Sequence, residues 1–318
     1  MIALDFSRAF DTVRHFNLKK CAKLLMHDNI YDWLVNYLED REHYTKFKGA
    51  MSARARINAS IVQGSGIGPV AYVIDASDLR PLHQLNDLSK YADDSILLVP
   101  SSNSSLVPEE ISHISLWAME NNLKLNVQKT KEMIVHKPRT KITNSPPILA
   151  GIERVETMNI LGVQFQSNLT FRDHVDHLLA QCAQNMYALR TLKSQGLHSF
   201  KLWEVAQSVL LGKLTYASQV WWGMLDAESK ARLDGALKKV VKQGLLPSPY
   251  KSFSEICIGL DKTLLQSILS NPNHVLHRLL PPVKTSVYNM RARPHNREVP
   301  STKDALHSKT FLVRMLYL

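Results

Sequence analysis

The stretch Ser89-Lys-Tyr-Ala-Asp-Asp-Ser-Ile-Leu-Leu-Val99 decides the fold of this 318-residue chain. Tyr, Ile, Leu and Val on either side of its paired aspartates favour β-strand. The pair itself, Asp93-Asp94, favours a tight connection between two strands. We therefore expect a β-hairpin whose tip presents carboxylates. Neighbouring carboxylates oppose each other's ionisation unless a cation neutralises them, so the tip predicts a nearby cation.

A further carboxylate, Asp5, lies in the short apolar run Met1-Ile-Ala-Leu-Asp-Phe6. This run predicts a core strand with Asp5 at its C-terminal end. If that strand lies beside the hairpin, Asp5, Asp93 and Asp94 form one cluster. Such a cluster, without His or Cys, suits Mg²⁺, which prefers oxygen ligands. Two Mg²⁺ ions held roughly 3.5–4 Å apart form a site for in-line phosphoryl transfer.

The composition limits the class of protein. A hydrophobic content of 45% and a charged content of 21% indicate a globular chain, long enough for two or three subdomains. The net charge of +11 favours an anionic partner, most often nucleic acid, although a merely basic protein remains the alternative. The three cysteines are far apart and suggest neither a disulfide framework nor a zinc site, which fits a reducing compartment. No apolar run approaches the roughly 20 residues of a membrane span, and no signal peptide is apparent.

The glycine-rich stretch Gln63-Gly-Ser-Gly-Ile-Gly-Pro69 superficially resembles a dinucleotide-binding loop. Its spacing is wrong, and no acidic residue follows a second strand at the required distance. We interpret it as a flexible backbone that lets a base pair or sugar approach closely; the alternative is a plain turn that enters a helix.

Periodicity predicts the other elements. Helices are expected over residues 18–26, 31–40, 70–85 and 107–121, and a strand pair with one basic face over 44–62. After residue 168 helical periodicity dominates, with helices expected over 174–194, 200–224, 227–243 and 260–280.

In this order the motifs resemble those of the reverse transcriptases of non-LTR (LINE-type) retrotransposons, most closely the jockey and CR1 branch. The matching segments are Ala3–Val13 (motif A), Gln63–Pro69 leading to Ala76–Leu79 (motif B), Tyr91–Asp94 (motif C), Trp117–Asn126 with Lys129–Lys131 (motif D), and Ile160–Val163 with Leu169–Phe171 and His174 (motif E). A single motif would be weak, but the ordered set is specific.

The resemblance implies an α+β fold. A reverse-transcriptase palm, an antiparallel sheet with packed helices, would occupy residues 1–168. A mostly helical thumb and following segment would occupy 169–280, and a basic C-terminal tail 281–318. The implied activity is that of an RNA-directed DNA polymerase, which uses two Mg²⁺ ions, with Mn²⁺ as an alternative. Its partners would be an RNA template, a DNA primer and dNTPs, with no membrane, in the nucleus or cytoplasm.

The resemblance also implies residue roles at the reacting centre. Asp5 and Asp93 would be the principal metal ligands, with Asp94 nearby and less directly bound, and the carbonyl of Phe6 would assist. Phe10, five residues after Asp5, matches the steric gate that excludes a ribose 2′-hydroxyl; the alternative is a core Phe.

Other roles concern the substrate and the primer. Gln63 and Gly64 would line the nucleotide and template pocket. Lys129 is the candidate that protonates pyrophosphate, the alternative being a solvated surface lysine. Leu161 and Gly162 would belong to the primer grip.

Three weaker signals have ordinary explanations. The stretch Asp173-His-Val-Asp-His177 is expected to cap and solvate a helix rather than to bind a metal. Trp203, Trp221 and Trp222 are expected in the core rather than stacked on bases. The basic residues Arg291, Arg293, His295 and Arg297 would either contact phosphate or belong to a solvated tail.

Several departures from the family affect the expected activity. The family's fingers subdomain and endonuclease lie upstream of motif A, where this sequence has nothing. Val62 replaces the usual proline, and Asp75 stands where the family prefers an apolar or Tyr-Ile-Asn-like run. We therefore expect a palm-plus-thumb fragment with weak or no polymerase activity. The alternative is a non-catalytic nucleic-acid-binding remnant of a retroelement.

Overall fold

The structure, a computed structural model, describes residues 1–138, 140, 145–284, 295–301 and 304–317. The chain forms two compact units. The first comprises Met1–Val135 with Lys141–Leu161, and the second His136–Thr140 with Gly162–Leu318. The first unit combines helices with short strands, and the second is largely helical. The predicted α+β class is therefore confirmed.

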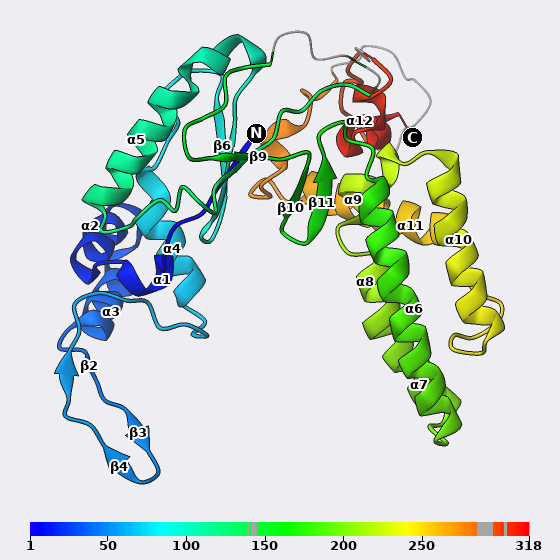
Figure 1. The fold of residues 1–318 in the computed structure, drawn as a ribbon, viewed down its shortest axis with the longest axis horizontal. Coiled ribbons are helices and arrows are strands. Elements are labelled where there is room, and N and C mark those ends of the chain that lie inside the picture. The colour runs from blue at the N-terminus through cyan, green and yellow to red at the C-terminus, as the bar shows by residue number, and fades with distance from the viewer. Residues whose placement is uncertain (139, 141–144, 285–294, 302–303, 318) are drawn as a thin grey trace. The chain divides into compact units, whose positions relative to one another are not determined.

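A five-stranded sheet forms the centre of the first unit (Figure 1). Its strand order is β6-β7-β1-β8-β9. All neighbouring strands are antiparallel except β8 and β9. The strands are β1 (Ile2–Leu4), β6 (Asp87–Tyr91), β7 (Asp94–Leu98), β8 (Lys131–Glu132) and β9 (Glu153–Arg154). The short apolar strand β1 therefore lies in the middle of the sheet, with the hairpin β6–β7 along one side.

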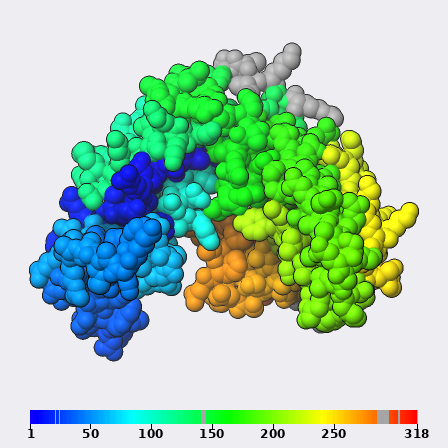
Figure 2. All heavy atoms as spheres, turned by 60° about the horizontal axis from the view of Figure 1, so that its bottom comes forward, coloured from blue at the N-terminus to red at the C-terminus, as the bar shows by residue number. Residues whose placement is uncertain are grey.

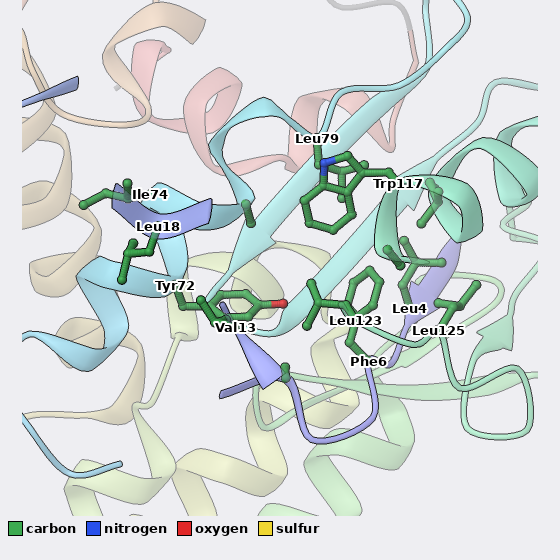
Figure 3. Packing of buried hydrophobic residues seen from close by; sticks show 14 of the residues in the cluster. Leu4, Phe6, Val13, Leu18, Tyr72, Ile74, Leu79, Trp117, Leu123 and Leu125 are labelled. Atoms are coloured by element: carbon green, nitrogen blue, oxygen red, sulfur yellow. The ribbon is translucent and has the colours of Figure 1, made fainter. Parts of the chain in front are cut away.

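The helices of the first unit cover this sheet and enclose its core. They are α1 (Ala9–Thr12), α2 (His15–Leu25), α3 (Asp28–Leu38), α4 (Gly68–Asp75) with a 3₁₀ turn Ala76–Asp78, and α5 (Val107–Glu120) after a 3₁₀ segment Ser101–Leu106. Figure 3 shows Leu4, Phe6, Trp117, Leu123 and Leu125 packed together. Alternate residues of a strand point to one face, which is why Ile2 and Leu4 are buried together.

Helix α4 is shorter than the helix expected over residues 70–85. It ends at Asp75 and tightens into the 3₁₀ turn Ala76–Asp78. Pro81 explains why the helix does not continue to residue 85, because a proline disfavours the helical region for the residue before it.

The predicted basic strand pair forms an extended arm, residues 42–56. It contains the pairs β2 (Glu42–His43) with β5 (Ala55–Arg56) and β3 (Lys46–Phe47) with β4 (Ala50–Met51), both antiparallel. Lys48 and Gly49 at its end have positive φ, 46° and 86°, as a tight hairpin turn requires.

The second unit is mostly helical, as the predicted thumb region would be. After β10 (Thr157–Ile160, in the first unit) and β11 (Val163–Gln166), it contains α6 (Arg172–Ser194), α7 (Ser199–Ala206), a π-helical turn Gln207–Leu211, α8 (Gly212–Leu214), α9 (Ser218–Trp221), a 3₁₀ turn Trp222–Met224, α10 (Ala227–Lys242), α11 (Phe253–Ser270), the 3₁₀ turns His277–Leu279 and His307–Lys309, and α12 (Phe311–Leu316).

Helix α11 differs from the helix expected over 260–280. It begins at Phe253 because Ser252 and Glu255 form a capping box, in which each side chain bonds the other's backbone. It ends at Ser270, two residues before Pro272, which again cannot continue a helix.

The segment predicted as a basic tail, 281–318, is packed at its end. Val313, Met315 and Leu316 of α12 are buried, and the Arg314 guanidinium bonds the buried Asp261 carboxylate at 2.7 Å. The apolar residues of α12 explain the difference, because burying them outweighs the preference of the basic residues for water. Arg291 and Arg293 lie outside the described residues. Within the part of the chain that is described, we find no helix with the length and apolar surface that crossing a membrane needs.

Candidate active site

The predicted hairpin is confirmed, with its tip at Ala92-Asp93. Strands β6 and β7 pair down to Tyr91 opposite Asp94. The connection is thus two residues long, and Ala92 takes a positive φ of 51°. Such short hairpin turns favour positive φ because their twist then matches that of the strands. The turn holds Asp93 at the exposed end of the sheet.

The register of β1 against β7 brings Asp5 to the same end. Ile2 lies opposite Leu97, and Leu4 lies opposite Ser95. One further step in this register places Asp5 beside Asp94. The Asp5 carbonyl accepts a 2.7 Å hydrogen bond from the Asn126 amide, and this bond holds the residue where β1 ends.

A cleft of about 450 Å³ opens at this end of the sheet. It brings together six of the residues predicted for the site: Asp5, Phe6, Phe10, Gln63, Asp93 and Lys129. Ser7, Arg8, Ala9 and Asn126 complete its lining. The sequence-based reasoning missed these four, although three of them lie between Phe6 and Phe10 within motif A.

The remaining predicted residues lie outside this lining. Asp94 begins β7 next to Asp93. Gly64 follows Gln63 and has a positive φ of 78°, with open space where a Cβ would stand. Leu161 and Gly162 form a turn after β10 with positive φ of 48° and 84°, so their primer-grip role stays a prediction.

Asp94 and Tyr72 respond to the negative charge at the hairpin tip. The pKa of Asp94 is raised, first by partial burial and then by the negative charges of Asp93 and Asp5. The pKa of the buried Tyr72 phenol is also raised, by burial, by Asp93 and by Asp75. In both shifts the negative charge of Asp93 adds to the effect of burial, and a bound cation would relieve that added part.

The cleft suits a divalent cation in its donor chemistry. No group of three His, Cys, Asp or Glu side chains close enough to hold a metal ion occurs among the residues that the structure describes. Two carboxylates, Asp5 and Asp93, do line the cleft together. Mg²⁺ typically binds through one or two carboxylates and fills its remaining positions with water and substrate phosphate. The residues present therefore fit an oxygen-ligated cation.

Phe10 packs against the core and also lines the cleft, so its steric-gate role stays a prediction. Its ring stacks on Tyr72 with centroids 5.2 Å apart and planes at 24°, and it packs against the core. The same ring lines the cleft. A ring fixed from behind in this way is rigid, which a steric gate requires.

Gln63 is held by a contact between two motifs. Its side-chain amide donates a 3.0 Å hydrogen bond to the Asp11 carboxylate on α1. This contact ties the glycine-rich loop to the segment that carries Asp5 and Phe10.

Lys90 fastens the hairpin to the end of α4. Its ammonium group donates hydrogen bonds to the carbonyls of Ala76 and Leu79. Burial and the nearby Arg80 lower the pKa of Lys90 to about 8, against an opposing effect of Asp78. The cation satisfies carbonyls that the end of a helix leaves free.

The carboxyl group of Asp75 is buried without the hydrogen bonds that would offset its loss of water. It is 1% exposed, and neither side-chain oxygen has a hydrogen-bond partner among the described residues. Burial, followed by the charge of Asp78, raises the pKa of Asp75 from 3.8 to about 7. This is the position where the sequence departs from the family's apolar preference.

We expect Asp75→Asn to stabilise the protein at pH 8 by about 1–3 kcal/mol, because the amide cannot ionise and so avoids the penalty for charging a buried carboxyl. The folded pKa lies above the unfolded one, so the wild type carries no ionisation penalty below pH 4. Its stability falls as the pH rises toward 7, and the loss is complete above 7. Urea unfolding at pH 4 and pH 8 measures the difference. The exposed Asp32→Asn on α3 is the control, and an equal gain at both pH values would contradict the explanation.

The stretch Asp173–His177 lies in the first turns of α6, whose N-cap is Phe171, and it is solvated only in part because His174 and Val175 are buried. His174 is 2% exposed and accepts a 3.3 Å hydrogen bond from the Gln164 amide. Burial and His177 lower the pKa of His174 to about 4. Trp221 and Trp222 are buried and pack on Phe253, so both belong to the core as predicted. Trp203 is half-buried.

Comparison with known proteins identifies related sequences. Residues 1–165 match the family model described as reverse transcriptase (RNA-dependent DNA polymerase). Three curated relatives come from Drosophila melanogaster. They are the probable RNA-directed DNA polymerase from transposon BS (29% identity; 60% of this chain, 22% of the relative), that from transposon X-element (27%; 75% and 27%) and the RNA-directed DNA polymerase from mobile element jockey (28%; 55% and 20%).

This chain therefore spans between 20% and 27% of the length of these relatives. Among solved structures it is similar to apo telomerase from Candida tropicalis (15% identity, TM-score 0.40, 76% of this chain and 43% of that one). A second similar structure is the telomerase of that organism in complex with the TWJ fragment of telomeric RNA (14% identity, TM-score 0.42, 84% of this chain and 42% of that one). At these scores the structural similarity supports no further conclusion.

Proposed function

We propose, since this chain belongs to the reverse transcriptase (RNA-dependent DNA polymerase) family, that its cleft extends a DNA primer on an RNA template. The relatives from BS, X-element and jockey support the predicted likeness to non-LTR retrotransposon enzymes. One observation carries the proposal: the cleft brings Asp5 and Asp93, ninety positions apart in the chain, to the same lining as Phe10, Gln63 and Lys129.

The reaction would proceed at the carboxylate end of this cleft. The 3′-hydroxyl of the primer gives its proton to solvent water and attacks the α-phosphorus of a dNTP; the new O–P bond forms as the bond to pyrophosphate breaks, and pyrophosphate leaves with the bonding electron pair. Asp5 and Asp93 would hold Mg²⁺, or Mn²⁺ in its place. When bound, two such ions supply positive charge for the attacking and leaving oxygens. We infer a secondary contribution of Asp94 and of the Phe6 carbonyl.

The other lining residues would orient the substrate. Lys129 is exposed at the cleft, where its ammonium group can donate a proton to departing pyrophosphate. Gln63, held by Asp11, would contact the nucleotide or template, with Gly64 leaving space beside it. Leu161 and Gly162 would contact the primer end.

A primer-extension assay with the full chain tests the proposal. We expect a DNA primer annealed to RNA to lengthen in the presence of Mg²⁺ and dNTPs, and a primer with no complementary template to stay unchanged. RNA binding without extension at any protein concentration would instead identify a non-catalytic nucleic-acid-binding remnant.

We expect Phe10→Val to relax sugar selection. A smaller side chain leaves room for a ribose 2′-hydroxyl, so the dNTP-to-rNTP ratio of kcat/KM should fall on the order of 10-fold or more. Single-nucleotide incorporation kinetics measure this ratio. Phe200→Val, at a ring 57% exposed on α7, is the control. If Phe10→Val slows both nucleotides equally, the ring only supports Tyr72.

A further inference from the structure

Two stacked aromatic rings on α3 of the first unit lie beside a cation that follows the helix. Trp33 and Tyr37 are four residues apart and therefore share a face of the helix. Their rings stack with centroids 5.4 Å apart and planes at 12°. Arg41 follows the helix, and its guanidinium carbon lies 4.7 Å from the centre of the Tyr37 ring. Trp33 is 55% exposed, so this stack has one open face.

The arm adds two further contacts between a ring and a cation. The Lys48 ammonium lies 5.5 Å from the centre of the Phe47 ring, and the Arg54 guanidinium carbon lies 5.8 Å from that of Tyr44. Phe47 is 69% exposed and Tyr44 is 48% exposed. Figure 1 shows the arm leaving the end of α3 and pointing away from the five-stranded sheet. In Figure 2 the blue segment that includes the arm forms a protruding lobe of this unit.

The arm is mainly cationic. Residues 42–56 contain four Lys or Arg residues and one acid, Glu42. Glu42 pairs with Arg54 at 3.6 Å and the preceding Asp40 pairs with Arg56 at 3.7 Å, and both ion pairs are long and exposed. Such pairs neutralise little. All residues of the four short strands are exposed, and an isolated hairpin of this kind gains little stability from itself.

A groove of about 540 Å³ lies at the base of the arm. Its lining contains four cations, Arg14, Lys19, Arg41 and Arg56, and two acids, Glu39 and Asp40, together with the exposed ring of Phe16. Two of these cations are paired, Lys19 with Glu39 at 3.2 Å and Arg56 with Asp40 at 3.7 Å. An excess of positive charge therefore continues from the arm to α2, within the unit that carries the cleft.

We propose that α3 and the arm bind an unpaired strand of RNA. The exposed rings of Trp33, Tyr44 and Phe47 stack on its bases, and Lys46 and Lys48 contact its phosphates. Unpaired bases present both faces for stacking, whereas a duplex hides them, so the rings favour a single strand. The proposal rests on the proposed function only in identifying this strand as template RNA.

Fluorescence anisotropy with a labelled, unstructured 20-nucleotide RNA, in EDTA and without dNTPs, tests the surface separately from catalysis. Tyr44→Ala with Phe47→Ala is expected to weaken binding about 10-fold or more, since each stacked base contributes about 1–3 kcal/mol. The affinity for a duplex of the same sequence should change less than about 2-fold. Lys46→Gln with Lys48→Gln should reduce the slope of log Kd against log salt by about 1.4, or about 0.7 per phosphate contact.

The matched control is Phe200→Ala in the second unit. This ring is 57% exposed, and Lys201 lies 5.6 Å from its centre, so it has the same ring-and-cation geometry elsewhere. Circular dichroism confirms that each variant is folded. The proposal is overturned if Phe200→Ala loses as much RNA affinity as the arm variants, or if the arm variants lose as much affinity for the duplex as for the single strand. Unchanged RNA binding with altered self-association would also overturn it and would indicate a protein-binding surface. If the wild type never extends a primer but the arm variants still lose RNA affinity, this inference holds and the polymerase proposal fails.

Discussion

Asp93→Asn is expected to lower primer extension by at least about 10³-fold without changing the fold. The substitution keeps the size of the side chain but removes its charge, which leaves Asp5 as the single carboxylate of the pair in the cleft. Losing one electrostatic stabiliser of a transition state commonly costs about 10²–10³ in rate, and loss of a cation adds to this. A 10³-fold loss corresponds to about 4 kcal/mol of transition-state stabilisation. Because Asp93 lies in an exposed turn, stability should be unaffected.

Asp87→Asn is the matched control for this variant. Asp87 is an exposed aspartate at the opposite end of the same hairpin, where it lies opposite Leu98. Extension by this variant should equal that of the wild type. Binding of Mn²⁺, followed by electron paramagnetic resonance, should weaken for Asp93→Asn and stay unchanged for Asp87→Asn. If Asp93→Asn extends the primer as fast as the wild type, the assignment of the cleft as the polymerase site is wrong.

Arg314→Met is expected to destabilise the protein by about 3–5 kcal/mol. Asp261 on α11 is 2% exposed, and one of its oxygens accepts the 2.7 Å hydrogen bond from Arg314. The other oxygen has no partner within the described part of the chain. Burial raises the pKa of Asp261, while Arg314 opposes that rise. Removing the arginine leaves a buried charge unpaired, which is the costly way to break such a pair.

The pH dependence and a second substitution test this explanation. Because the pKa of Asp261 is raised, the penalty should be largest at pH 8 and should shrink as the pH falls and the carboxyl takes up a proton. Adding Asp261→Leu to Arg314→Met should restore most of the stability in urea unfolding, because no buried charge remains. Arg232→Met is the control. Its 2.6 Å pair with Asp176 is exposed and should contribute less than about 1 kcal/mol. If Arg314→Met unfolds like this control, the buried pair is not what anchors α12.

Elements with a strong local pattern could be predicted from the sequence. The hairpin around Asp93 follows from β-favouring residues on both sides of a turn. Helix α5 follows from Pro108 and acidic residues at its start and an apolar face with Ile114 and Trp117. These signals act over a few residues, where propensity and periodicity suffice. Element ends were less predictable, as α4 and α11 show, because caps and prolines decide them.

The candidate site was predicted mainly through its ordered motifs. The residue types and their spacing name Asp5, Phe10, Gln63, Asp93 and Lys129, and the cleft brings these five together. Neighbours such as Arg8 and Asn126 were missed because lining a cleft depends on the direction of a side chain. That direction is set by packing and not by the local pattern.

The sequence alone determined that this chain belongs to a class with a palm-like sheet, that carboxylates stand at a hairpin tip, and that the chain is basic. Local propensity and motif order carry that information. The tertiary structure decided which carboxylates meet, because the register of β1 against β7 sets Asp5 beside the tip. It also decided that Asp75 is buried, that Lys90 bonds the end of α4 and that α12 packs on Asp261. Each depends on contacts between residues far apart in the chain, which a local pattern does not encode.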